Sequence, residues 1–185
     1  GLTLFLVDPK AKGLAVERTA MVDSHNAARI VFDNVEVNAD SVLGEVDQGF
    51  GLLEGVLNIG RGAVASEMVG LSDEVFGRTV TYLKERKQFG RPIGSFQALQ
   101  HRAADMLVQL EQARSMAYYA AMSAEEPDAA ERRKAMSAVK VQIGRSARYV
   151  GQQAIQLHGG IGMTDEHDIG LYMKREAVLG KIGRA

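Results

Sequence analysis

Two different hydrophobic periods follow one another along the chain, and the change falls near residue 46. Before it, short apolar runs end at turn signals such as Asp8-Pro9, and residues 28–37 alternate apolar and polar side chains. Alternation with a period of two is typical of half-buried strands. The pattern predicts three or four short strands, too few to form a stable sheet by themselves. Either they pack on the rest of the chain, or their partner strands are absent from it.

Beyond about Asp47, apolar residues recur every three or four positions, which is the spacing of one helix face. Four segments show this spacing, the last shorter than the others: Leu53–Leu83, Ser95–Ala120, Ala135–Leu157 and Glu166–Leu179. Ser95 is a good N-cap for the second helix. Long helices with short connections favour an antiparallel up-and-down four-helix bundle. We therefore expect a mainly α fold, with a small antiparallel β remnant in residues 1–46 and a helical-bundle domain in residues 47–185.

Charge and composition narrow the classes of function. The 22 Lys and Arg residues nearly balance the 23 Asp and Glu residues, so no nucleic-acid partner is expected. No apolar run approaches the roughly 20 residues that span a bilayer, so no membrane insertion is expected either. The chain has no cysteine, which excludes a disulfide framework and a thiolate metal site and is compatible with a reducing compartment. We expect a cytoplasmic location and, because "GLTLFLV" starts in the middle of a strand, a C-terminal fragment of a longer protein.

The segment "QLHGGIGMTDEHD", residues 156–168, allows three interpretations. A metal site needs converging ligands, but the four histidines at 25, 101, 158 and 167 are widely spaced, so no metal is expected. A phosphate cradle needs glycines that open a helix after a strand, whereas these follow a helix. In the third interpretation the glycines end one helix, Thr164 or Asp165 caps the next, and Glu166 and Asp168 lie in its first turn.

Two long motifs resemble the acyl-CoA dehydrogenase family. They are "YLKERKQFGRPIGSFQALQHRAADM" at residues 82–106 and "VQIGRSARYVGQQAIQLHGGIGMTDEHDIGLYMKR" at residues 141–175, the second with the Gln-x-x-Gly-Gly-x-Gly signature of the family's C-terminal helical domain. Residues 28–50, "ARIVFDNVEVNADSVLGEVDQGF", are similar to the end of the family's middle β-domain. The likeness covers essentially the whole chain in the same order. It implies that residues 1–46 are the end of that β-domain.

The resemblance implies an FAD-dependent oxidoreductase that dehydrogenates the Cα–Cβ bond of an acyl-CoA thioester to give trans-2-enoyl-CoA. An electron-transfer flavoprotein would accept the electrons, and the protein would be a homo-oligomer, a dimer of dimers. Two alternatives stay open. One is a non-catalytic, oligomer-forming subunit that contributes half of a shared FAD site. The other is an acyl-CoA oxidase or flavin-dependent hydroxylase of the same fold, with a different base.

The resemblance also implies which residues contact FAD. They come from both motifs: Arg86, Gln88, Phe89, Gln97, Gln156, Leu157, His158, Gly159 and Gly160. A guanidinium forms bidentate bonds to pyrophosphate oxygens, and glycine lets the backbone approach a dinucleotide closely. His158 is expected to pack or bond locally. Arg86 and Gly159 are expected to serve different FAD molecules, which is a reason to expect an oligomer.

The substrate side of the expected site departs from the family. The positions that match the family's CoA-contacting residues are Asn58 and Arg61, and the usual Asp of that pair is Asn58 here. Proton abstraction needs a carboxylate base, but the two positions where the family places one correspond to Gly60 and to the region of Gly183 and Arg184. Glu54 and Glu67 each lie six residues from Arg61, and Glu176 is interpreted as a surface acid. No catalytic base is therefore named, and this chain by itself is expected to be inactive.

Overall fold

The structure is a computed structural model that describes residues 1–21 and 26–182. The chain divides into two compact units, Gly1–Gly55 and Val56–Ala185. This division falls inside the first long helix, and the sequence-based boundary between residues 46 and 47 stays a prediction. His25, Gly183 and Arg184, all considered above, lie outside the described residues.

The first unit contains short antiparallel strand pairs, as predicted. Strand β1 (Leu4–Phe5) pairs with β4 (Val42–Leu43), and β2 (Leu14–Ala20) pairs with β3 (Asn26–Phe32). A short 3₁₀ turn, η1 (Ala39–Ser41), precedes β4. The β2–β3 ladder runs in unbroken register from Leu14 opposite Phe32 to Ala20 opposite Asn26. Large apolar side chains on this hairpin, including Val16, Ile30 and Phe32, are exposed.

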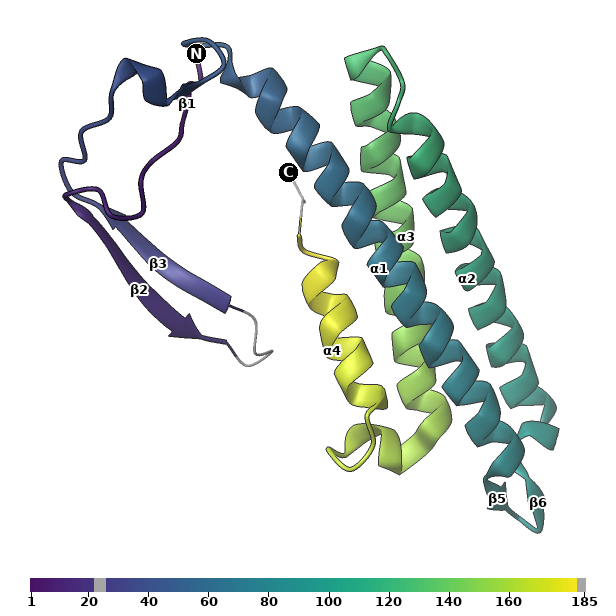
Figure 1. The fold of residues 1–185 in the computed structure, drawn as a ribbon. Coiled ribbons are helices and arrows are strands. Elements are labelled where there is room, and N and C mark those ends of the chain that lie inside the picture. The colour runs from purple at the N-terminus through teal and green to yellow at the C-terminus, as the bar shows by residue number, and fades with distance from the viewer. Residues whose placement is uncertain (22–25, 183–185) are drawn as a thin grey trace. The chain divides into compact units, whose positions relative to one another are not determined.

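The second unit is built on helices, and the predicted four-helix fold is confirmed (Figure 1). The long helices are α1 (Gly49–Glu85), α2 (Gln97–Ser123) and α3 (Ala129–His158), and α4 (Ile169–Leu179) is the shortest. The two-residue strands β5 (Lys87–Gln88) and β6 (Arg91–Pro92) and the 3₁₀ turn η2 (Ile93–Ser95) join α1 to α2. A third 3₁₀ turn, η3 (Gly159–Met163), follows α3. In the described part of the chain, no helix is both long and apolar enough to cross a membrane.

The helices enclose two clusters of buried side chains, because each turns one apolar stripe inward. The cluster nearer the α2–α3 connection consists of Ala65, Met68, Ala113, Ala120, Met136, Val139, Ile143, Ala147 and Leu179. The other consists of Val75, Leu83, Met106, Val150, Ala154, Leu157 and Ile169. All four helices contribute side chains to the core, and this packing fixes the positions of the helix ends relative to one another.

Two helix starts differ from the sequence-based predictions. Ser95 is not the N-cap of α2: it lies in η2, where its Oγ donates to the carbonyl of Pro92 at 2.7 Å, and α2 begins after Phe96 without a side-chain cap. The helix that does carry a cap is α3, where Asp128 Oδ1 accepts the backbone N–H of Ala130 at 2.8 Å. The prediction for Ser95 was wrong because the residue already bonds within the preceding turn.

The start of α4 also differs. Neither Thr164 nor Asp165 caps it, since Thr164 Oγ1 donates back to the carbonyl of Ile161 at 2.9 Å and so belongs to the end of η3. Asp168 occupies the N-cap position without a side-chain bond to the helix, and Glu166 precedes it. The Asp168 carboxylate accepts instead from Arg78 Nη1 of α1 at 2.6 Å. This ion pair positions the α4 start on α1 in place of a local cap.

Glu176 of α4 is not a surface acid, contrary to the sequence-based interpretation. It is only 3% exposed, and its carboxyl lies between Ser72 of α1 and Gly151 of α3. Its Oε2 atom has no hydrogen-bond partner. Burial raises the pKa of this carboxyl to about 8, against the opposing effect of the Ser72 hydrogen bond. Glu176 is therefore a buried, protonated part of the α1–α4 interface near neutral pH.

Candidate functional site

The first part of the expected cofactor site is the β5–β6 hairpin, which begins at the end of α1. The backbone N–H of Ile93 donates to the carbonyl of Arg86 at 2.8 Å and closes the hairpin at its base. The two turn residues, Phe89 and Gly90, have φ angles of 53° and 75°. Positive φ at both central positions is the conformation of a two-residue hairpin turn, which asparagine and glycine favour. Phenylalanine is a rare residue in this conformation.

Phe89 is also almost completely exposed, at 91%. Its ring meets the edge of Phe96 with centroids 6.1 Å apart, and the Arg91 guanidinium lies 4.2 Å from the centre of the Phe96 ring. Arg86, Gln88 and Gln97, the first residue of α2, are exposed beside them. A large aromatic ring held in solvent by a strained turn is an arrangement suited to contact a ligand.

The second part is the end of α3. Gly159 ends the helix with a φ of 65°, and its N–H donates to the carbonyl of Gln156. Gly159 and Gly160 are exposed, and a Cβ at either position would meet no protein atom within 4 Å. The space beside this turn is therefore open to a ligand. Gln156 is exposed as well, whereas the Leu157 side chain belongs to the core.

His158, between these residues, is only 3% exposed. Its Nδ1 lies 2.8 Å from the carbonyl oxygen of Ala154, which can only accept, so Nδ1 carries the proton. Its Nε2 is buried without a partner. Burial lowers the pKa of His158, so the ring is neutral near pH 7. The expectation that His158 packs and bonds locally is confirmed.

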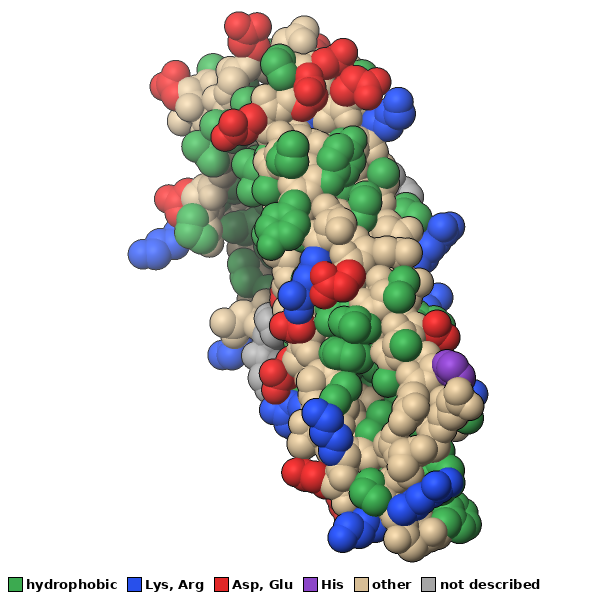
Figure 2. Space-filling model, turned by 90° about the vertical axis from the view of Figure 1, so that its right-hand side faces the viewer, with side chains coloured by type: hydrophobic (Ala, Val, Ile, Leu, Met, Phe, Trp, Pro, Cys, Tyr) green, Lys and Arg blue, Asp and Glu red, His purple; other side chains and the backbone are tan. Residues whose placement is uncertain are grey.

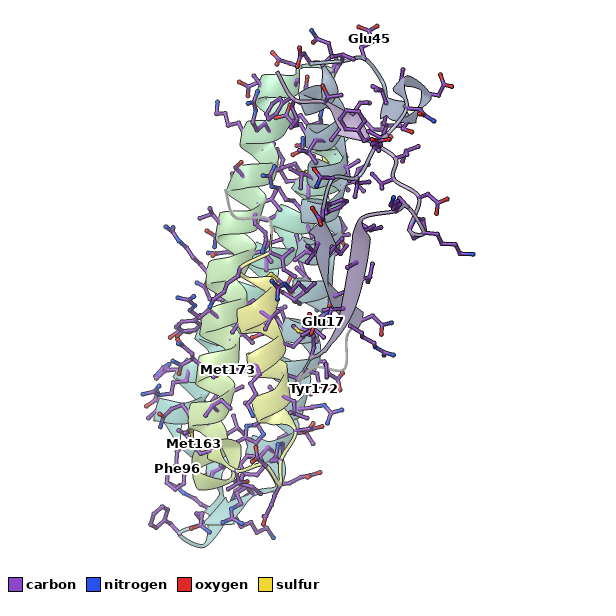
Figure 3. The ribbon with its side chains drawn as sticks, turned by 90° about the vertical axis from the view of Figure 1, so that its left-hand side faces the viewer. Glu17, Glu45, Phe96, Met163, Tyr172 and Met173 are labelled. Carbon is purple, nitrogen blue, oxygen red and sulfur yellow. The ribbon has the colours of Figure 1, made fainter. Side chains whose placement is uncertain are left out.

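The structure brings these two parts to the same end of the bundle. Tyr82, one helical turn before Arg86, stacks on the His158 ring with centroids 4.4 Å apart. Arg102 of α2 donates to Gln153 of α3 at 2.7 Å and joins the adjacent helix ends. Figure 3 labels Phe96 and Met163, which mark the hairpin side and η3 at this end. Lys and Arg side chains gather around the same end in Figure 2, which suits an anionic ligand.

Asn58 and Arg61, the expected CoA contacts, lie elsewhere. Arg61 Nη1 donates to Asn58 Oδ1 at 3.0 Å, and Asn58 is 3% exposed with its Nδ2 unpartnered. Both are on α1, and the 25 residues from Arg61 to Arg86 correspond to about 38 Å of helix. The structure therefore does not bring the substrate pair together with the cofactor motifs.

Of the acids considered as a base, Glu67 and Glu176 are both engaged within the bundle. Gly60 is exposed, and a Cβ there would meet no protein atom within 4 Å. Glu67 Oε1 accepts from Arg175 Nη2 of α4 at 2.7 Å, and Glu176 is enclosed in the bundle. Among the residues that the structure describes, no group of three His, Cys, Asp or Glu side chains is arranged to hold a metal ion.

Sequence reasoning missed two side chains at the end of the bundle where the two motifs meet. Tyr82 and His167 contact His158, with the two imidazole centroids 4.8 Å apart. Tyr82 stood inside the first motif and His167 inside the second, but nothing in their spacing showed that they meet. Their contact depends on the packing of α1 against the end of α3.

Known proteins resemble this chain in sequence and in structure. A family model described as "Acyl-CoA dehydrogenase, C-terminal domain" matches residues 47–182. The mitochondrial short/branched chain specific acyl-CoA dehydrogenase of Bos taurus is 36% identical over 98% of this chain and 42% of its own length. The caffeyl-CoA reductase–Etf complex subunit CarC of Acetobacterium woodii is 31% identical over 91% of this chain and 45% of its own.

A solved structure shows the same fold. The butyryl-CoA dehydrogenase of Megasphaera elsdenii superposes with a TM-score of 0.86, at 28% identity, over 97% of this chain and 47% of its own. The chain thus spans about half the length of the relatives that it matches. The matched residues 47–182 include both sequence motifs and all four helices, α1 to α4. The chain belongs to the FAD-dependent acyl-CoA dehydrogenase family and carries its C-terminal domain.

Proposed function

We propose that this chain supplies one part of an FAD site in an enzyme that dehydrogenates an acyl-CoA thioester to trans-2-enoyl-CoA. The observation that carries the proposal is the meeting of both cofactor motifs at one end of the bundle, through the stack of Tyr82 on His158. FAD, when bound, supplies the hydride acceptor of this reaction. The open space beside Gly159 and Gly160 fits a dinucleotide passing close to the backbone.

In this proposal, each residue at that end has a separate role in binding. Arg86 neutralises a pyrophosphate charge, and Phe89 offers its exposed ring to the adenine face. Gln88, Gln97 and Gln156 are exposed amides within the same region and can bond the polar edges of the nucleotide. His158 and Leu157 support the turn from inside, because their side chains are buried.

The geometry favours one FAD molecule for both motifs. Arg86 follows Tyr82 by one turn, and Gly159 is adjacent to His158, so both flank the same stack. This differs from the expectation that Arg86 and Gly159 serve different FAD molecules. The oligomer is supported instead by the distance along α1: the substrate pair Asn58 and Arg61 lies about 38 Å from this end. We propose a homo-oligomer, a dimer of dimers, in which each chain binds the cofactor of another subunit.

A non-catalytic role for the chain is the second candidate function. It is favoured by Gly60 and by the buried position of Glu176, since neither provides a base that reaches an α-proton. The electron acceptor in the first candidate is an electron-transfer flavoprotein, which the relative from Acetobacterium woodii supports through its name as a subunit of an Etf complex. By itself, the 185-residue chain would not turn over acyl-CoA in either case.

The cofactor proposal is tested by replacing Arg86 with Ala in the intact protein that carries this chain. Loss of a charge-assisted phosphate bond, worth roughly 1.5–3 kcal/mol, should weaken FAD binding about tenfold to a hundredfold. Lys134→Ala is a matched control, because it removes an exposed positive charge at the start of α3, where Lys134 pairs only weakly with Glu131 at 3.6 Å. Equal FAD affinity in the Arg86 variant and the wild type would contradict the proposal.

The two candidate functions are separated by anaerobic mixing with acyl-CoA thioesters of several chain lengths. A dehydrogenase bleaches the absorbance of its own flavin with at least one of them. A non-catalytic subunit leaves the flavin oxidised until a second, catalytic subunit is added.

A further inference from the structure

Three rings from different elements meet beside the glycine turn. Tyr82 of α1 stacks on His158 at the end of α3 with an interplanar angle of 25°. His167, just before α4, approaches Tyr82 edge-on at 6.4 Å and His158 at 4.8 Å. The His167 Nδ1 accepts the backbone N–H of Ile169 at 3.2 Å, which fixes that ring to the start of α4. The stack therefore joins α1, α3 and α4 at one point.

Tyr82 also reaches the backbone of the turn. Its hydroxyl donates to the carbonyl oxygen of His158 at 3.3 Å. That carbonyl and the N–H of Gly159 belong to the same peptide group, and the N–H donates to the carbonyl of Gln156. The peptide is thus held at both its ends, by α1 on one side and by α3 on the other. A planar peptide fixed at both ends has one orientation.

Tyr82 is also connected to the β5–β6 hairpin, through the last turn of α1. The Arg86 N–H donates to the carbonyl of Tyr82 at 2.9 Å, so Tyr82 and Arg86 are joined through the last turn of α1. The side chain of Tyr82 therefore contacts the glycine turn, while its backbone supports the residue expected to bind phosphate. Within the first motif, Tyr82 is the residue that stacks on the His158 ring and bonds the His158 carbonyl.

We propose that Tyr82 is a positioning residue for FAD. Tyr82 orients the His158–Gly159 peptide and holds the glycine turn at a fixed position relative to Arg86. This rests on the proposed cofactor site. Tyr82 does not touch the cofactor in this role: it acts through the peptide and through the stacked, neutral His158 ring. Its hydroxyl and its ring have separable effects, since the hydroxyl orients the peptide and the ring packs on His158.

The test compares Tyr82→Phe with the wild type in the intact protein. The substitution keeps the ring and removes the hydroxyl. FAD affinity, measured by flavin fluorescence, should fall about twofold to tenfold, the effect of one neutral hydrogen bond. Tyr118→Phe is the matched control: Tyr118 lies exposed on α2, and its FAD affinity should equal that of the wild type. At saturating FAD, kcat with acyl-CoA should also equal that of the wild type in Tyr118→Phe.

Hydrogen exchange of the apoprotein distinguishes this positioning role of Tyr82 from a general contribution to stability. Hydrogen exchange of the Gly159 amide should become faster in Tyr82→Phe, while exchange in the middle of α2 stays as in the wild type. Unchanged FAD affinity, or a loss of affinity matched by faster exchange throughout the bundle, would overturn the role of Tyr82. If Tyr82→Phe gives one of these opposing results while Arg86→Ala weakens FAD binding, the cofactor site stands and only the positioning role of Tyr82 fails. If neither variant differs from the wild type, both proposals fail.

Discussion

Ser72 Oγ donates a hydrogen bond of 3.0 Å to Glu176 Oε1 across the interface of α1 and α4. The bond joins residues 104 positions apart and is buried. Charged groups also border the site: Lys140 of α3 bonds the carbonyl of Leu179, and Arg148 of α3 lines the adjoining hollow. Burial nevertheless outweighs the hydrogen bond and raises the pKa of Glu176 to about 8.

This pKa makes stability depend on pH. In the unfolded chain a glutamate titrates near its ordinary value of 4.5, whereas the folded protein keeps the proton up to about pH 8. Between these values the folded state binds more protons at Glu176, so the contribution of this group to stability is full below pH 4.5 and is lost as pH rises, by up to about 1.4 kcal/mol per unit, until about pH 8. Glu176→Gln should remove this slope. The measurement is urea unfolding from pH 5 to 8.5, and a constant difference between variant and wild type would contradict it.

The Glu176 carboxyl occupies the space that a side chain at position 151 would need, so this position favours glycine. A Cβ at this position would overlap Oε2 of Glu176 and lie 3.4 Å from Met173 Cγ. We expect Gly151→Ala to destabilise the bundle by about 1–3 kcal/mol, because the added methyl would displace the buried Glu176 carboxyl from its place beside Ser72. The control is Gly144→Ala on the same helix, where a Cβ has open space and should be neutral or stabilising. Thermal unfolding of both variants checks this, and similar melting temperatures would be the opposing result.

Asp128, a cap found in the structure, and Ser95, a cap predicted from the sequence, can be compared directly. Asp128 Oδ1 accepts backbone N–H groups of Ala130 at 2.8 Å and Glu131 at 3.4 Å. Asp128→Ala should therefore destabilise the protein by about 1 kcal/mol. Ser95→Ala should change stability by less than about 0.5 kcal/mol, because its hydroxyl caps no helix and bonds only Pro92. Denaturant unfolding measures both; a larger loss for Ser95→Ala than for Asp128→Ala would show that the assignment of caps is wrong.

Phe89 should trade stability against cofactor binding. Asn-Gly is the preferred pair for a turn with two positive φ angles, so Phe89→Asn should stabilise the protein by about 1 kcal/mol. Little apolar burial is lost, since the ring is 91% exposed. The same variant should bind FAD more weakly, because the ring is lost from the proposed adenine contact. Thermal unfolding of the apoprotein and FAD titration are the two measurements, and the prediction fails if the variant binds FAD as tightly as the wild type.

The sequence was informative about helices and less so about their ends. Apolar residues spaced by three and four, such as Met68, Val75 and Leu83, occupy the core as predicted. Helix starts were less predictable, because Ser95 and Asp168 have polar partners that only the fold reveals. Glu176 was misread for the same reason. A carboxylate in a helix is usually solvated, and nothing local indicates Ser72 and Gly151 on two other helices.

The candidate site shows a similar division. The motifs that contain Arg86 and Gly159 were recognised as two segments, and the structure adds that they lie at one end of the bundle. That proximity depends on Tyr82 and His158, residues 76 positions apart that stack through tertiary packing. The strain at Phe89 could not be predicted either, because the pattern of a short hairpin does not state the sign of φ at each residue.

Helix α1 runs without interruption from Gly49 to Glu85, so it fixes both the distance and the relative direction of the Arg61 and Tyr82 side chains. An insertion within it turns everything beyond by about 100° per residue and lengthens the helix by about 1.5 Å. One added residue would thus rotate Tyr82 away from His158 even if every side chain were kept. Seven residues, nearly two full turns, would preserve its facing while shifting the hairpin by about 10 Å. Changes of length in this segment are therefore confined to near-whole turns, whereas the loop at Glu125 and Glu126 carries no such restriction.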